Sequence, residues 1–147
     1  MQPKFLTSTL DFYHPSFTTE VVCTFYDVGI EAGFPSPADD FIELSIDINK
    51  EYIKNRDTTF FARVNGYSMK DVGIFDGDLL IIDKSLEPSN DKIAICQIDG
   101  DFTVKRIKIE YDTVWLIAEN EAYEPIKVTA ENELIIWGIV VASIKKF

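Results

Sequence analysis

The sequence predicts a mainly β protein: a small, mostly antiparallel β-fold of sandwich or barrel type with an extended N-terminal arm. Three observations lead to this prediction. The chain has 147 residues, of which 46% are hydrophobic, enough for one domain with a core. Short apolar runs separated by turn residues follow one another from about residue 58 to the C-terminus. Asp99-Gly100, a dipeptide typical of hairpin turns, stands between two of these runs.

The first 32 residues predict an arm rather than a domain of their own. Aromatic residues recur there without a steady period, and one short strand is compatible with the pattern. The following stretch, "AGFPSPADDF", spans residues 32–41. Pro35 and Pro37 lack backbone N–H groups and keep the residues before them extended. We expect an exposed strap that could serve as a linker, a docking segment or a substrate.

The predicted core, residues 33–147, begins with a short helix and continues in strands. In residues 45–55, Ile48, Tyr52 and Ile53 stand at helical spacing. The last apolar run is long, and we expect it to bend near Gly138. Strands are predicted within the runs at 58–66, 77–85, 92–100, 101–110, 113–120 and 134–147.

The net charge of −11 bears on the partners of the protein. The phosphates of nucleic acids and the headgroups of anionic membranes would repel such a chain. We therefore expect no tight direct binding to DNA. A role on DNA would require a partner that brings the protein there.

Cysteine and histidine usage argues against a metal site. Cys23 and Cys96 lie far apart and form no CxxC pattern, and His14 is the single histidine. No apolar run is long enough to cross a membrane, and the N-terminus lacks the basic start and apolar block of a signal peptide. We expect a cytoplasmic protein with reduced thiols, no metal and no cofactor.

The acidic residues have plain interpretations. Asp71, Asp76 and Asp78 fit no metal-binding loop, and the last two flank a glycine as turn residues do. The acidic residues at 119–124 are expected on the solvated surface. Trp137 is expected in the core rather than in a ligand site.

Two residues could together supply nucleophilic chemistry. Ser68 follows Gly66 in a turn-like stretch, but a serine hydroxyl needs a base to become a good nucleophile. With histidine effectively unavailable, a lysine kept neutral by burial is the remaining candidate. In "DFTVKRIKIE", the period of two places Lys105 on one strand face. The residues of that face are Thr103, Lys105, Ile107 and Ile109.

Both candidates also have simpler interpretations. A serine in such a turn can present its hydroxyl to solvent, and its simpler interpretation is a turn serine that bonds its own backbone. A lysine in a basic strand is usually solvated, because its long chain reaches outward. The residue pattern alone leaves these alternatives open for Ser68 and Lys105.

Four segments resemble the LexA/UmuD family of self-cleaving Ser–Lys proteins. The serine segment of that family is similar to NGYSMKDVGIFDGDLLIIDKS, residues 65–85, and its lysine strand is similar to GDFTVKRIKI, residues 100–109. Its cleavage region is similar to AGFPSPADDF, and NEAYEPIKV, residues 120–128, also matches. The four matches occur in the family's order, from about residue 30 to the end of the chain.

The resemblance implies a fold and an activity. The fold would be the β-rich protease fold of the family, and residues 1–32 would be a cleavable arm. Ser68 would be the nucleophile, Lys105 its general base and Ala32-Gly33 the scissile bond. The strap would then be the protein's own substrate. Thr103 shares the strand face of Lys105, and we expect it to orient the lysine amine.

The length of the arm and the "FPSP" strap resemble the UmuD branch of the family. Residues 1–32 are too few for the DNA-binding domain of the repressor branch, and they carry one lysine against four acidic residues. The branch implies a regulatory subunit of an error-prone translesion polymerase in the SOS response to DNA damage. A RecA–single-stranded DNA filament would stimulate cleavage, and the trimmed homodimer would bind a UmuC-type polymerase. Ala32 departs from this branch, since an Ala–Gly pair is typical of LexA.

Two other functions stay open. The chain could be a β-domain binding module without protease activity, in which Ser68 and Lys105 are incidental. It could also be a prophage-type LexA-like regulator that lacks a DNA-binding domain. A Ser–Lys signal peptidase would share the chemistry, but it should carry a membrane anchor, which the sequence does not show.

Overall fold

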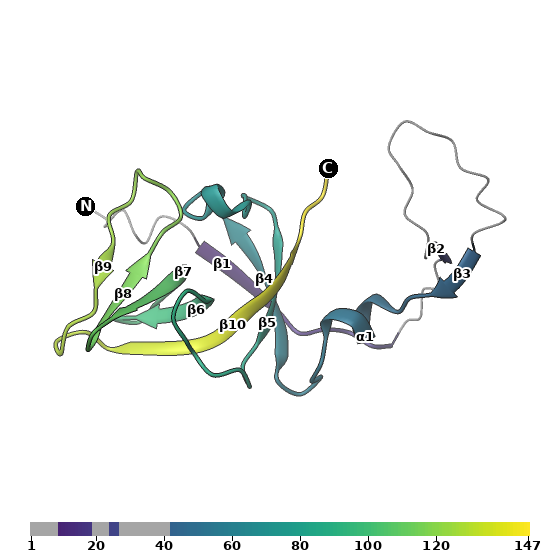
Figure 1. Ribbon diagram of the computed structural model, residues 1–147, viewed down its shortest axis with the longest axis horizontal. Coiled ribbons are helices and arrows are strands. Elements are labelled where there is room, and N and C mark those ends of the chain that lie inside the picture. The colour runs from purple at the N-terminus through teal and green to yellow at the C-terminus, as the bar shows by residue number, and fades with distance from the viewer. Residues whose placement is uncertain (1–8, 19–23, 27–41) are drawn as a thin grey trace. The chain divides into compact units, whose positions relative to one another are not determined.

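The computed structural model describes residues 9–18, 24–26 and 42–147 (Figure 1). The chain divides into two compact units, one formed by residues 1–15 and 55–147 and the other by residues 16–54. Within the described ranges, no helix is long and apolar enough to cross a bilayer.

The smaller unit contains a two-stranded ribbon and one short helix. Strands β2 (Thr24–Tyr26) and β3 (Ile42–Ser45) pair antiparallel. Helix α1 (Ile48–Tyr52) follows, and the Asp47 side chain caps it by accepting a hydrogen bond from the Asn49 N–H at 2.9 Å. The helix predicted within residues 45–55 is confirmed.

The larger unit is built on one eight-stranded antiparallel sheet in the order β1-β4-β5-β10-β6-β7-β8-β9. The predicted mainly β, mostly antiparallel fold is confirmed. A short 3-10 helix, η3 (Lys70–Val72), precedes β5. The strands are β1 (Thr9–Tyr13), β4 (Thr59–Asn65), β5 (Leu79–Asp83), β6 (Ile93–Ile98), β7 (Asp101–Glu110), β8 (Thr113–Ile117), β9 (Ile126–Lys127) and β10 (Leu134–Ile144).

Local backbone chemistry explains two features of this sheet. Asp99 and Gly100 both have positive φ, 49° and 89°, as a tight hairpin between β6 and β7 requires. In β10 the register with β6 shifts between Ile136 and Gly138, at the expected irregularity. A side chain at Gly138 would start 2.5 Å from the Cγ2 atom of Ile82, so only glycine lets β10 approach β5 this closely.

The middle of the sheet is buried on both faces. Neighbouring residues of β6 point to opposite sides, so Ile95 joins one apolar cluster while Ala94 and Cys96 join another. The first cluster extends over β4 and β5, and the second extends over β7 and β8. Side chains on both faces of β7 at residues 103–105 are therefore removed from water.

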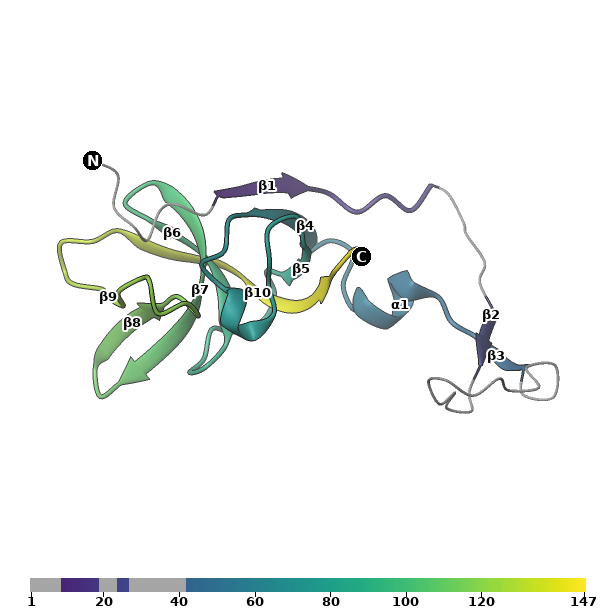
Figure 2. The ribbon, with the colours of Figure 1, turned by 90° about the horizontal axis from the view of Figure 1, so that it is seen from above.

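The sheet curls, so that its first strand approaches β7. The ring of Phe12 on β1 lies 5.1 Å from the ring of Phe102 on β7, measured between centroids. Figure 2 shows β1 running alongside β4 at the edge of the sheet. Strand β1 thus belongs to the larger unit, although its residues fall in the predicted arm.

Candidate active site

Strand β7 carries Lys105 into the interior of the sheet. Thr103 and Lys105 share a face, as predicted, and both are 0% exposed. The Lys105 Nζ donates hydrogen bonds to the Thr103 Oγ1 at 2.8 Å and to the Val104 carbonyl at 3.2 Å. The alternative of a solvated lysine is therefore wrong. Ile109, expected on the same buried face, is exposed because the strand leaves the core before it ends.

The surroundings of Lys105 favour its neutral form. Burial lowers the pKa of its amine from the ordinary value of 10.5 to about 8, and the neighbouring Cys96 acts weakly in the opposite direction. Burial also raises the pKa of the Cys96 thiol to about 12, so this thiol is uncharged at neutral pH. None of the ion pairs among the described residues involves Lys105. An amine with this pKa can act as a general base near physiological pH.

Ser68 lies in the serine loop, residues 66–78, which connects β4 to β5. Its side chain is buried, with 1% of the residue exposed, so its hydroxyl is not presented to solvent as a turn serine's can be. Two aspartates shape this loop: the Gly66 N–H donates to the Asp76 carboxylate, and the Phe75 N–H donates to the Asp78 carboxylate, both at 2.8 Å. The interpretation of these aspartates as turn residues is confirmed.

Glu119 and Asn120, which follow β8, hold the serine loop in place, and we call this pair the latch. The Asn120 Nδ2 donates to the Tyr67 carbonyl at 2.9 Å, and the Glu119 N–H lies 3.4 Å from the Met69 sulfur. The latch thus contacts the residue on each side of Ser68. The orientation of the peptide groups around Ser68 depends on these contacts.

The latch also contacts the lysine strand. The Glu119 carboxylate accepts a hydrogen bond from the Arg106 Nε, and Arg106 adjoins Lys105 in β7. The latch therefore connects the segments that carry Ser68 and Lys105.

The latch was not predicted from the sequence. The acidic residues at 119–124 were expected on the solvated surface, whereas the Glu119 side chain is 25% exposed and paired, and Asn120 is buried. The available signal was a polar pair that directly follows the apolar run ending at Ala118.

The predicted cleavage site lies outside the described residues. Ala32 and Gly33 belong to residues 27–41, which connect β2 to β3 in the sequence. Cys23 also lies outside the described residues. His14 is exposed just after β1.

A comparison with protein families decides the classification. The family model described as Peptidase S24-like matches residues 24–141, which include Ser68, Lys105 and the Ala32-Gly33 bond. The chain belongs to the Peptidase S24-like family. Membership agrees with the antiparallel fold and with the resemblance to LexA/UmuD proteins stated above.

Individual members of the Peptidase S24-like family match over most of this chain. The LexA repressor of Ectopseudomonas mendocina is 42% identical over 118 residues, which make up 80% of this chain and 57% of the relative. The LexA repressor 1 of Pseudomonas putida is 43% identical over 118 residues, 80% of this chain and 58% of the relative. Protein SamA of Salmonella typhimurium is 42% identical over 115 residues, 78% of this chain and 79% of the relative. The chain thus spans somewhat more than half the length of the LexA repressors it matches.

Proposed function

We propose that this Peptidase S24-like protein is a self-cleaving regulator that cuts its own Ala32-Gly33 bond with a Ser–Lys pair. One observation carries the proposal: Lys105 is fully buried, is hydrogen-bonded to Thr103, and has its pKa lowered to about 8. Burying a lysine amine costs folding free energy, which a purely structural lysine would not repay. The lowered pKa that results from burial suits a general base.

The reaction is an acyl transfer followed by hydrolysis. The Ser68 Oγ attacks the carbonyl carbon of Ala32 while the neutral Lys105 amine takes the hydroxyl proton. Backbone N–H groups at Ser68 and its neighbour stabilise the oxyanion. The C–N bond then breaks, and the protonated Lys105 returns its proton to the Gly33 amine. Water, deprotonated by Lys105, hydrolyses the ester and restores Ser68.

The substrate is part of the same molecule, so no diffusional encounter is needed. A bond held near the nucleophile within one assembly reacts at a high effective concentration. Lys105 is already fully buried, so docking of the strap would act by positioning the scissile bond and excluding water from it. A RecA–single-stranded DNA filament would act by favouring the docked strap, without contributing a catalytic group.

The proposed setting is the SOS response of a bacterial cytoplasm. The trimmed homodimer would bind a UmuC-type translesion polymerase as its regulatory subunit. Support comes from the UmuD-like "FPSP" strap and from the match that covers 79% of Protein SamA. The charge of −11 supports recruitment to DNA through partners rather than through phosphate contacts.

Intact mass spectrometry tests the proposal. The purified chain is incubated with and without RecA assembled on single-stranded DNA. We expect a fragment that begins at Gly33, and no fragment from Ser68→Ala. Ser89→Ala, an exposed serine, is the matched control and should cleave normally. A fragment that begins elsewhere would overturn the Ala32-Gly33 assignment, and an unchanged mass would favour a binding module without protease activity.

A further inference from the structure

Strand β1 occupies an edge of the sheet that would otherwise be open. It pairs antiparallel with β4, and Leu10 lies opposite Val64 while Phe12 lies opposite Ala62. Val64 and Ala62 are both buried in the core. The face of β1 that carries Leu10 and Phe12 therefore lies beside buried residues of β4, and Leu10 packs against the core.

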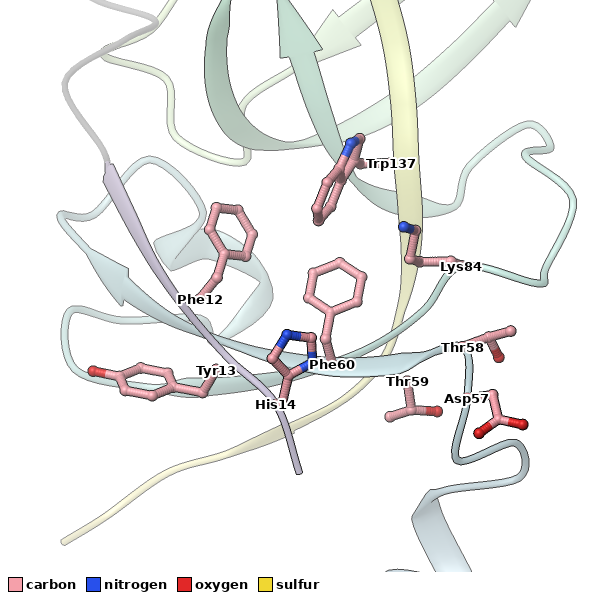
Figure 3. Close-up of a pocket in the computed structure, with 9 residues that line it drawn as sticks. All are labelled: Phe12, Tyr13, His14, Asp57, Thr58, Thr59, Phe60, Lys84 and Trp137. Carbon is pink, nitrogen blue, oxygen red and sulfur yellow. The ribbon is translucent and has the colours of Figure 1, made fainter. Parts of the chain in front are cut away.

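Phe12 inserts into an aromatic socket, defined as Phe60, Phe102 and Trp137. Its ring centroid lies 5.1 to 5.8 Å from the centroids of these three rings. Figure 3 shows Phe12 beside Phe60 and Trp137. The socket rings also contact one another: Trp137 packs edge-on against Phe60 at 5.1 Å and against Phe102 at 5.4 Å. Contacts among the core residues thus support the socket independently of Phe12.

Phe12 does not fill this region completely. A pocket of about 190 Å³ lies beside it, with Phe12 and His14 on one side and Thr59 and Trp137 on the other (Figure 3). Phe12 itself remains 37% exposed. The Lys84 amine lies 4.4 Å from the centroid of the Trp137 ring, so the pocket also presents a cation. Trp137, expected only as a core residue, therefore also lines an accessible pocket.

The outward face of β1 adds a polar contact. Asp11 lies opposite Arg63 in the register, and its carboxylate accepts a hydrogen bond from the Asn65 Nδ2 at 3.2 Å. The β4 edge thus binds a segment with an apolar residue, an acidic residue and an aromatic residue in succession. Main-chain pairing supplies affinity in such strand addition, and the side-chain pockets supply specificity.

Whether β1 stays on the β4 edge depends on the chain segment that joins the two strands. The segment between β1 and β4 contains the Ala32-Gly33 bond, so β1 is tethered to its edge in the uncut chain. A tether of this kind supplies an effective concentration on the order of millimolar. After the cut, β1 is held by its own pairing and by the short β2–β3 ribbon, and an isolated two-stranded ribbon is marginally stable.

We propose that the β4 edge, residues 61–65, and the aromatic socket form a strand-binding site that cleavage opens to a partner protein. The partner supplies an extended segment with the apolar–acidic–aromatic pattern of Leu10, Asp11 and Phe12. This proposal rests on the proposed cleavage, because an uncut chain keeps β1 in the site.

The test separates the strand-binding site from the protease activity. A recognition sequence for a site-specific protease is inserted after Ala32 in the full chain that carries Ser68→Ala. The chain is then cut by that added protease, and both pieces are kept. The probe is a fluorescent peptide with the sequence TSTLDFYHP, residues 7–15, titrated by anisotropy against cut and uncut protein.

We expect the cut protein to bind the peptide at least ten-fold more tightly than the uncut protein. The Phe12→Ala peptide should bind at least ten-fold more weakly, because it loses the ring that packs against the three socket rings. The Thr9→Ala peptide, changed at an exposed position, is the matched control and should bind within about two-fold of the parent.

Three outcomes would overturn the proposal. Equal affinity for cut and uncut protein would mean that the tethered β1 does not block peptide binding to the site. Affinity insensitive to Phe12→Ala would remove the socket from recognition. Two cut chains could also form a dimer in which β1 of each chain occupies the β4 edge of the other and excludes the peptide. That result would assign the edge to a second copy rather than to a partner protein. Because the added protease makes the cut, failure of self-cleavage cannot produce any of these results.

Discussion

The Lys105 Nζ lies 2.8 Å from the Thr103 hydroxyl oxygen, and neither residue is exposed to solvent. The hydroxyl is an acceptor for the amine, so it directs the amine hydrogens toward Thr103. The amine lone pair, which must take a proton from the nucleophile, is thereby oriented elsewhere.

Spontaneous cleavage without RecA should accelerate as the pH rises and reach half of its maximal rate near pH 8. The pKa of Lys105 is lowered to about 8, and only the neutral amine accepts a proton, so the active fraction grows as the pH passes this value. Rates measured between about pH 7 and pH 10 test this. Lys105→Met should be inactive throughout, whereas Lys108→Met, on the same strand but partly exposed, should keep the parent profile. A flat parent profile would contradict lysine as the base.

Thr103→Val should slow cleavage at every pH and move the half-maximal pH downward. Valine keeps the volume but removes the acceptor, so the amine loses both its orientation and a contact that favours its charged form. We expect a rate reduction of roughly ten-fold or more, since orientation contributes strongly to proton transfer. Thr103→Ser retains the hydroxyl and should restore most of the rate. A Thr103→Val protein with the parent rate and pH profile would show that the hydroxyl has no role.

Lys105→Met should stabilise the fold more at neutral pH than at pH 10. The folded pKa of about 8 lies below the ordinary value of 10.5, so the unfolded chain binds more protons between these values and the parent gains stability as the pH rises. Each pKa unit corresponds to about 1.4 kcal/mol, so the advantage of methionine should shrink by on the order of 3 kcal/mol across this window. Urea denaturation in a Ser68→Ala background measures the difference. An advantage that does not change with pH would contradict the lowered pKa.

Asn120→Ala should slow cleavage while leaving the pH of half-maximal rate near 8. The substitution removes the hydrogen bond to the Tyr67 carbonyl, which orients the peptide before Ser68, but it does not touch Lys105. We expect a rate reduction of roughly ten-fold. Asn132→Ala, which removes comparable side-chain bonds at the distant Thr129 turn, is the control for general loosening of the fold. A similar rate loss in both variants would argue against a specific role of the latch.

The purified protein should show no submicromolar affinity for duplex DNA at physiological salt. Its charge of −11 places it among chains that phosphates repel. Fluorescence anisotropy with a labelled duplex measures the affinity. Tight, salt-dependent binding would contradict this prediction. It would mean that the chain has a local basic surface despite its negative net charge.

Alternation along a strand and turn dipeptides account for the elements that could be predicted correctly. The alternation in "DFTVKRIKIE" placed Thr103 and Lys105 on one face, and the Asp99-Gly100 pair marked the hairpin that the structure contains. Both signals act within a few residues of the chain, where backbone geometry dictates the outcome. The Ser–Lys assignment came from residue types and family resemblance, and it stays a prediction that the experiments above address.

The sequence by itself determined the fold class, the turn chemistry and the pairing of Thr103 with Lys105, because each depends on local geometry and on alternation along one strand. Only the tertiary structure decided that Lys105 and Ser68 are buried, that the latch joins the serine loop to β7, and that β1 covers the β4 edge. The physical reason is that burial on both faces and contacts between distant segments depend on which strands the curled sheet brings together. No pattern within a single segment encodes that arrangement.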